Sequence, residues 1–208
     1  MEIRLDILES GSFYHIYNRG INGCNVFLNN ENKLFFLQKV KEHIIPVANV
    51  YAYCLMNNHF HFIIQIKENL NLLNINKDGD STLSKFQTLT KFKDGLHSQK
   101  SIASKQIGKL ISSYTQAFNK LNNRHGSLFE SPFKRKRIES EIYLLQSIVY
   151  VHRNVLELNE KMEGYDFSSY KSILSDSKTL IKRKEVIEIF GNINNFRFIH
   201  QRYNSYEF

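Results

Sequence analysis

Residues 57–66 constrain the fold more than any other stretch of the chain. Their sequence is Asn-Asn-His-Phe-His-Phe-Ile-Ile-Gln-Ile, an apolar run rich in residues that favour β-strands. Side chains two apart in a strand share a face, so His59 and His61 point to one side and Phe60 and Phe62 to the other. The imidazole side resembles half of a metal site. A polar strand face without a function would give the same spacing.

Composition bounds the class of protein. The chain has 208 residues, enough for one domain or one domain with an appendage, and its 28 Lys and Arg against 20 Asp and Glu give a net charge of +8. This balance favours a polyanionic partner, nucleic acid first and an anionic membrane surface second; a merely basic soluble protein is the alternative. Cys24 and Cys54 are too few for a zinc site or a disulfide framework. With neither a signal peptide nor a spanning segment in the pattern, we expect a cytoplasmic protein.

Hydrophobic periodicity predicts an alternation of strands and helices. Strands are expected at 12–18, 47–56, 59–66 and 133–138, and helices at about 33–43, 101–121 and 140–158. The order is β-α-β-β-α-β followed by a helix. It predicts an α+β, ferredoxin-like antiparallel four-stranded sheet with helices on one face and a C-terminal helical extension. We expect a catalytic domain at 1–160, with a polar insertion at 67–100, and an extension at 161–208.

A tyrosine is the candidate nucleophile. A phenol has a pKa of about 10, so its attack on a phosphodiester needs a divalent cation to neutralise a nonbridging oxygen. Tyr114 lies on the apolar face of the helix at 101–121, beside Leu110 and Phe118, and would approach the metal if that helix covers the histidine face. The alternative is a core tyrosine with its hydroxyl at the rim. Six others compete for the role: Tyr14, Tyr17, Tyr51, Tyr53, Tyr143 and Tyr150.

Several short motifs together resemble the single-tyrosine HUH transposases, and within them the REP-associated tyrosine transposases. They occur in the family's order over about residues 12–172. The motifs are Tyr14-His15-Ile16-Tyr17-Asn18-Arg19-Gly20, Leu55-Met56-Asn57-Asn58-His59-Phe60-His61-Phe62, Tyr114-Thr115-Gln116-Ala117-Phe118-Asn119, His125-Gly126-Ser127-Leu128-Phe129, Tyr150-Val151-His152-Arg153-Asn154 and Tyr165-Asp166-Phe167-Ser168-Ser169-Tyr170.

The resemblance implies cleavage and rejoining of single-stranded DNA at hairpin-bearing ends. A covalent 5′-phosphotyrosine would form at Tyr114, and His59 and His61 would hold Mg²⁺ or Mn²⁺. Some relatives take a third metal ligand one helical turn after the tyrosine, where this chain has Phe118, which cannot ligate. Asn119 is therefore the candidate third ligand, with Gln116 and water as competitors.

Three other readings stay open. The same fold could bind a DNA or RNA hairpin without catalysis, as a domesticated copy that has lost the chemistry. It could instead be a metal-dependent phosphodiesterase that activates water. The active form could be a monomer or a homodimer.

The strand at 133–138 is strongly basic. Alternation places Lys134 and Lys136 on one face and Arg135 and Arg137 on the other. We interpret these side chains as phosphate contacts, which would make binding depend strongly on salt. The alternative is a solvated edge strand, where lysines oppose aggregation. Arg19 and Arg153 are further candidates for DNA binding. We interpret His152 as a histidine of the core. His15 is a candidate for a residue that contacts the metal ligands without binding the metal.

Overall fold

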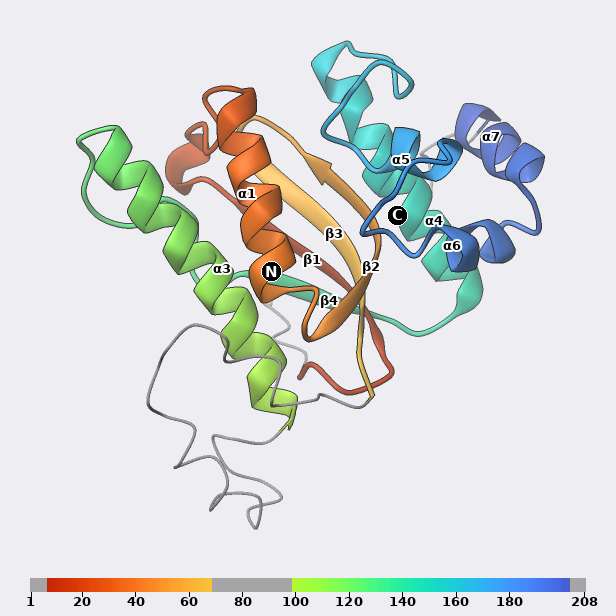
Figure 1. The fold of residues 1–208 in the computed structure, drawn as a ribbon, viewed down its shortest axis with the longest axis horizontal. Coiled ribbons are helices and arrows are strands. Elements are labelled where there is room, and N and C mark those ends of the chain that lie inside the picture. Colours follow the sequence, from red (N-terminus) through yellow and green to blue (C-terminus); the bar gives the residue numbers. More distant parts are fainter. Residues whose placement is uncertain (1–6, 69–98, 203–208) are drawn as a thin grey trace.

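The computed structural model describes residues 7–68 and 99–202 (Figure 1). Its elements follow the predicted order and are β1 Phe13–Arg19, η1 Ile21–Gly23, α1 Asn30–His43, β2 Ala48–Leu55, β3 His59–Ile66, α3 Gln99–Leu121, β4 Lys134–Ile138, α4 Glu141–Arg153, η3 Asn154–Leu158, α5 Tyr170–Leu174, α6 Arg183–Ile189 and α7 Ile193–Arg202. The predicted insertion at 67–100 lies almost entirely outside the described residues.

The sheet has the order β2-β3-β1-β4, with antiparallel pairing throughout. Strands β1 and β3 are therefore the central pair, which confirms the ferredoxin-like prediction. In their register, His59 lies opposite Arg19 and His61 lies opposite Tyr17. The histidine pair thus stands in the middle of the sheet, near the end of β1.

The two faces of the sheet carry different helices. Helices α1 and α3 lie side by side over one face (Figure 1), where Phe36 of α1 packs on Phe60 of β3 with ring centroids 5.0 Å apart. Helix α4 contacts β2 and β3 on the other face, where Tyr150 meets His61. Since Phe60 and His61 are neighbours in a strand, they point to opposite faces.

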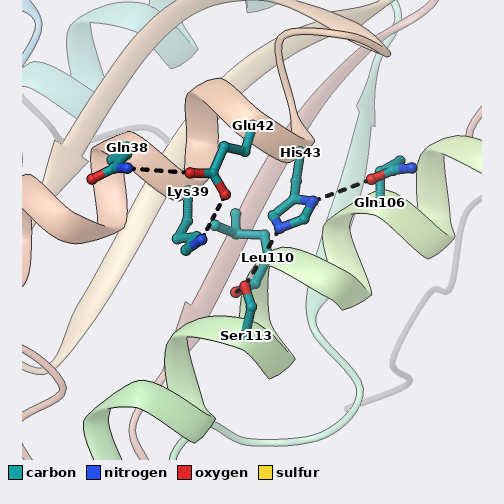
Figure 2. Close-up of polar contacts among 7 residues, drawn as sticks. All are labelled: Gln38, Lys39, Glu42, His43, Gln106, Leu110 and Ser113. Carbon is teal, nitrogen blue, oxygen red and sulfur yellow. Dashed lines mark hydrogen bonds and ion pairs between the residues drawn. The ribbon is translucent and has the colours of Figure 1, made fainter. Parts of the chain in front are cut away.

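Polar side chains join α1 to α3 at one end of the pair (Figure 2). The His43 ring lies 3.3 Å from Gln106 through Nδ1 and 3.5 Å from the Ser113 hydroxyl through Nε2. The Ser113 hydroxyl also donates to the Leu110 carbonyl at 3.1 Å, as serines inside helices commonly do. This cluster therefore fixes how α3 lies against α1.

Helix caps explain where two helices begin. Asn29 accepts a hydrogen bond from the Asn32 backbone N–H, so α1 begins at Asn30, slightly earlier than predicted. Ser140 accepts from the Tyr143 N–H at 3.2 Å and caps α4. Helix α4 ends at Arg153, and the predicted remainder is the 3₁₀ turn η3.

The turn between β2 and β3 is held by the loop that follows β1. The Asn57 carbonyl accepts from the Val26 and Phe27 N–H groups, and the Asn58 carbonyl accepts from the Gly20 N–H at 2.8 Å. A Cβ at Gly20 would lie 2.1 Å from the Cys24 carbonyl oxygen, so only glycine permits this approach. The position of His59 therefore depends on a loop about 35 residues earlier in the chain.

The C-terminal extension adds to the free edge of β2. The Leu55 N–H donates to Phe167, Ser169 donates to Tyr53, and Lys182 donates to Val50, each at 2.9 Å. These bonds anchor α5 and α6 beside the sheet. No helix among the described residues is both long enough and apolar enough to cross a membrane.

Candidate active site

One face of the sheet gathers the aromatic and basic side chains of three strands. In the antiparallel register, Tyr17 lies opposite both His61 and Lys134, and His15 lies opposite Lys136. Directly paired residues share a face. The residues on this face are His15 and Tyr17 of β1, His59 and His61 of β3, and Lys134 and Lys136 of β4.

Both histidines of the pair use Nδ1 for contacts within the protein. His59 donates through Nδ1 to the Asn58 side-chain oxygen at 2.6 Å. Nδ1 of His61 lies 2.8 Å from Nε2 of His15. The His59 and His61 rings are edge to face, with centroids 5.0 Å apart. Nε2 is consequently the nitrogen through which each ring can bind a ligand.

Burial favours the neutral form of these imidazoles. Burial lowers the pKa of His61 well below its ordinary value, and nearby His15 and His59 lower it further. Burial also lowers the pKa of His15 to about 4, with the Lys136 charge adding to the effect. For His59, burial lowers the pKa while the Glu157 carboxylate opposes the shift. Neutral imidazole is the form that binds metals.

A tyrosine from α4 lies directly beside this pair. The Tyr150 ring meets His61 edge to face at 5.7 Å between centroids and His15 at 5.9 Å, and the residue is 37% exposed. Asn154, one helical turn later, donates through its side-chain nitrogen to the Tyr150 backbone carbonyl at 2.8 Å, and its amide raises the pKa of His59. Burial raises the pKa of Tyr150 and the Glu157 charge raises it further, whereas the bond with Asn154 lowers it.

A cavity of about 460 Å³ opens beside these groups. Its walls include both histidines of the pair, and Arg19, Lys134 and Glu157 supply the charges. The Lys134 ammonium group lies 3.1 Å from the Glu130 carboxylate in an exposed ion pair. The opening therefore combines two imidazoles, the phenol of Tyr17, the amide of Asn58 and cationic side chains, and Tyr150 packs against His61 next to it.

Tyr114 does not belong to this site, and the prediction that it approaches the histidine pair is wrong. It is 1% exposed, its hydroxyl donates to the Val26 carbonyl at 2.6 Å, and its ring packs edge-on against Phe36. Burial raises the pKa of its phenol. The reason is that α3 covers the Phe60 face of the sheet, opposite the imidazoles.

Asn119 also lies elsewhere, so the prediction of a third ligand at this position is wrong. Its amide nitrogen donates to the Gly126 carbonyl at 2.7 Å, and its oxygen accepts from Arg124 at 2.9 Å. It lines a separate cavity with Gln116, its predicted competitor. Both residues belong to α3 and share its position relative to the sheet.

The predicted DNA-binding residues separate into two groups. Arg19 and Lys134 line the cavity, and Lys136 lies on the same face, over the Tyr143 ring. Three arginines point elsewhere. Arg135 donates to Ser104, Arg137 pairs with Glu9 at 2.6 Å, and Arg153 donates to the His200 carbonyl at 2.7 Å.

The donor set fits a divalent cation with open coordination positions. Among the residues described, no three His, Cys, Asp or Glu side chains form a group that could hold a metal ion. An ion on His59 and His61 would need its other ligands from Asn154, water or substrate oxygens. Nitrogen and oxygen donors of this kind suit Mn²⁺ and other first-row divalent ions, and oxygen from substrate suits Mg²⁺.

One signal in the sequence distinguishes Tyr150 from the other tyrosines. Tyr150 and Asn154 are four apart in a predicted helix, so both lie on one face, and a polar pair there contrasts with the apolar neighbours Val149 and Val151. The apolar stripe around Tyr114 instead indicates a buried helix face, as the structure has it.

The fold and this face together define a ferredoxin-like protein with a histidine–tyrosine site. The sequence matches no protein-family profile and no curated protein. Among solved structures, a REP-associated tyrosine transposase bound to a REP hairpin is similar, with a TM-score of 0.52, 10% identity, and coverage of 85% of this chain and 87% of that one. This likeness shows a shared fold.

A bacterial tRNA(His) guanylyltransferase-like protein in complex with GTP is also similar, with a TM-score of 0.39, 11% identity, and coverage of 94% of this chain and 74% of that one.

Proposed function

We propose that this protein cleaves and rejoins single-stranded DNA at hairpin-bearing ends, with Tyr150 as the nucleophile in place of Tyr114. The observation that carries the proposal is the position of the Tyr150 ring, edge-on to His61 beside the cavity that both histidines line. The net charge of +8 supports a polyanionic substrate. The fold shared with a hairpin-bound transposase supports the choice of substrate.

The chemistry assigns a role to each side chain. The Tyr150 oxygen attacks the phosphorus and forms the phosphotyrosine bond as the bond from phosphorus to the 3′ oxygen breaks. The phenol loses its proton and the departing oxygen gains one, which leaves a free 3′-OH. A divalent cation on His59, His61 and Asn154 would supply charge neutralisation at a nonbridging oxygen. Rejoining reverses these steps, because the phosphotyrosine bond retains the energy of the cleaved bond.

The cationic side chains hold the strand. Arg19 and Lys134 at the cavity would contact phosphates next to the scissile one, and Lys136 would extend this path along β4. Such contacts position DNA without reading its sequence. Two-point attachment of neighbouring phosphates keeps the reacting phosphate in line with Tyr150.

A denaturing gel tests the proposal. Labelled single-stranded hairpin oligonucleotides from both flanks of the gene are incubated with protein and Mn²⁺, with chelator as a blank. Wild type is expected to form a covalent adduct, Tyr150→Phe none, and Tyr114→Phe as much as wild type. An adduct that persists in Tyr150→Phe contradicts this nucleophile.

Two other results would replace the proposal. Nicking that survives Tyr150→Phe and fails in His61→Ala would indicate a phosphodiesterase that activates water. Hairpin binding by wild type without any adduct, with all flanking sequences and both metals, would indicate a binding protein that has lost catalysis.

A further inference from the structure

Two imidazoles from the central strands face one another behind the cavity. Nε2 of His15 lies 2.8 Å from Nδ1 of His61, and the rings are stacked at 29° with centroids 5.0 Å apart. His15 is partly buried and is enclosed by Tyr17 at 4.8 Å and Tyr150 at 5.9 Å. Lys136 lies opposite it on β4.

A single proton must lie between these two nitrogens. At this distance one nitrogen donates and the other accepts. If His15 donates, His61 accepts at Nδ1 and carries its own proton on Nε2. If His61 donates from Nδ1, its Nε2 has a lone pair. These are the two ways to place one proton between the two nitrogens.

Only one arrangement allows His61 to bind a ligand at Nε2. His59 has its proton on Nδ1 through a different partner. Its Nδ1 donates to the Asn58 side-chain oxygen, which can only accept. Both strand histidines thus have a hydrogen-bond partner at Nδ1. For His61 the partner is a ring from another strand.

We propose that His15 is a positioning residue, which accepts the Nδ1 proton of His61 and so fixes the tautomer and ring plane that leave Nε2 available to a divalent cation. This inference rests on the proposed function for the presence of the cation. It predicts that the effect of His15 is visible in metal binding without DNA, because His15 acts on the ligand and touches no phosphate. Partners of this kind are typically worth 10–100-fold in metal affinity.

Mn²⁺ titration followed by electron paramagnetic resonance tests this inference. His15→Phe keeps an aromatic ring and removes the acceptor, so its Mn²⁺ Kd should rise about 10–100-fold. His15→Gln places an amide oxygen at about the reach of Nε2 and should stay within roughly threefold of wild type. His125→Phe, at an exposed histidine after α3, controls for the loss of an imidazole.

Long-range ¹H–¹⁵N spectra of the histidine rings provide a second measurement on the unaltered protein. With Mg²⁺ present, the His61 proton is expected on Nδ1. Wild-type Mn²⁺ affinity in a folded His15→Phe protein, or a His61 proton on Nε2 with metal bound, would overturn the inference. The two proposals remain separable, because Tyr150→Phe should abolish the adduct and keep the Mn²⁺ affinity.

Discussion

At the scale of single residues, the environment of a hydroxyl separates a structural tyrosine from a reactive one. The Tyr114 hydroxyl satisfies the Val26 carbonyl in the core, and the ring has four aromatic neighbours besides Phe36 (Phe27, Phe35, Phe118 and Phe129). Tyr150 is partly exposed, and its ring packs edge-on against His61 and His15. The same chemical group therefore contributes to stability at Tyr114, whereas at Tyr150 the proposed function assigns it a role in catalysis.

Tyr114→Phe should reduce the free energy of unfolding by about 1–3 kcal/mol, because the Val26 carbonyl is left buried without its donor. Tyr150→Phe should cost less than about 1 kcal/mol, since the residue is 37% exposed. Urea unfolding of both variants checks this order. A larger loss for Tyr150 than for Tyr114 would contradict the burial argument.

A buried lysine offers a second residue-scale test. The Lys33 ammonium group donates to the Asn57 side chain at 3.2 Å and to the Tyr165 hydroxyl at 2.9 Å, and lies 5.0 Å from the Phe167 ring centroid. Burial lowers its pKa. Lys33 thus ties α1 and the extension to the turn that precedes His59.

Lys33→Met should lower the free energy of unfolding by roughly 1–3 kcal/mol, because the oxygens of Asn57 and Tyr165 lose a charged donor. Lys39→Met is the matched control on the same helix, and should cost about 0–1 kcal/mol, because its ion pair with Glu42 is at the surface. Equal losses in the two variants would argue against a role for Lys33 in holding the turn.

At the scale of elements, β4 presents two chemically distinct faces. Lys134 and Lys136 share the face of the histidines, whereas Arg135 and Arg137 lie on the α3 side, where they contact Ser104 and Glu9. The two lysines of β4 therefore belong to the candidate DNA-binding surface, whereas its two arginines make contacts within the protein.

The double variant Lys134→Gln, Lys136→Gln should bind hairpin DNA more weakly. The slope of log affinity against log salt should fall by about one to two units, because two phosphate contacts are lost. The double variant Arg135→Gln, Arg137→Gln is the control and should keep the wild-type slope. Fluorescence anisotropy at several salt concentrations measures both, and equal slopes for the two variants would refute the division of faces.

At the scale of the whole molecule, a chain of hydrogen bonds joins α7 to α4, the helix that carries Tyr150. His200 donates through Nδ1 to the Phe196 carbonyl at 2.7 Å, so its Nε2 accepts from His152 Nδ1 at 2.8 Å. His152 Nε2 then accepts from the Ser169 hydroxyl at 2.7 Å. The prediction of His152 as a core histidine agrees with its complete burial.

This chain should make stability depend on pH. Burial lowers the pKa of His200 from 6.5 to about 4, and the Arg153 charge adds to this, while the bond to Phe196 opposes it. Between these values the unfolded chain binds a proton that the folded one does not. The contribution is therefore complete above pH 6.5 and is lost as the pH falls toward 4, by roughly 3 kcal/mol in all.

Urea unfolding at pH 7 and pH 4.5 measures the effect. His200→Gln should lose less stability over this interval than wild type, because it removes the group that titrates. His125→Gln, at an exposed histidine, should behave as wild type. Identical pH dependence in His200→Gln and wild type would contradict the linkage.

Local pattern was sufficient for the order of elements, the antiparallel sheet and the shared face of His59 and His61, because strand alternation, helix periodicity and capping depend on near neighbours in the chain. That a tyrosine of α4, and not Tyr114 of α3, lies against the imidazoles beside Tyr17 was decided only by the tertiary structure. Both faces of this sheet are covered by a helix that carries a tyrosine, α3 by Tyr114 and α4 by Tyr150. Which helix covers the histidine face is decided by the packing of the whole chain. The periodicity of a single segment cannot predict it.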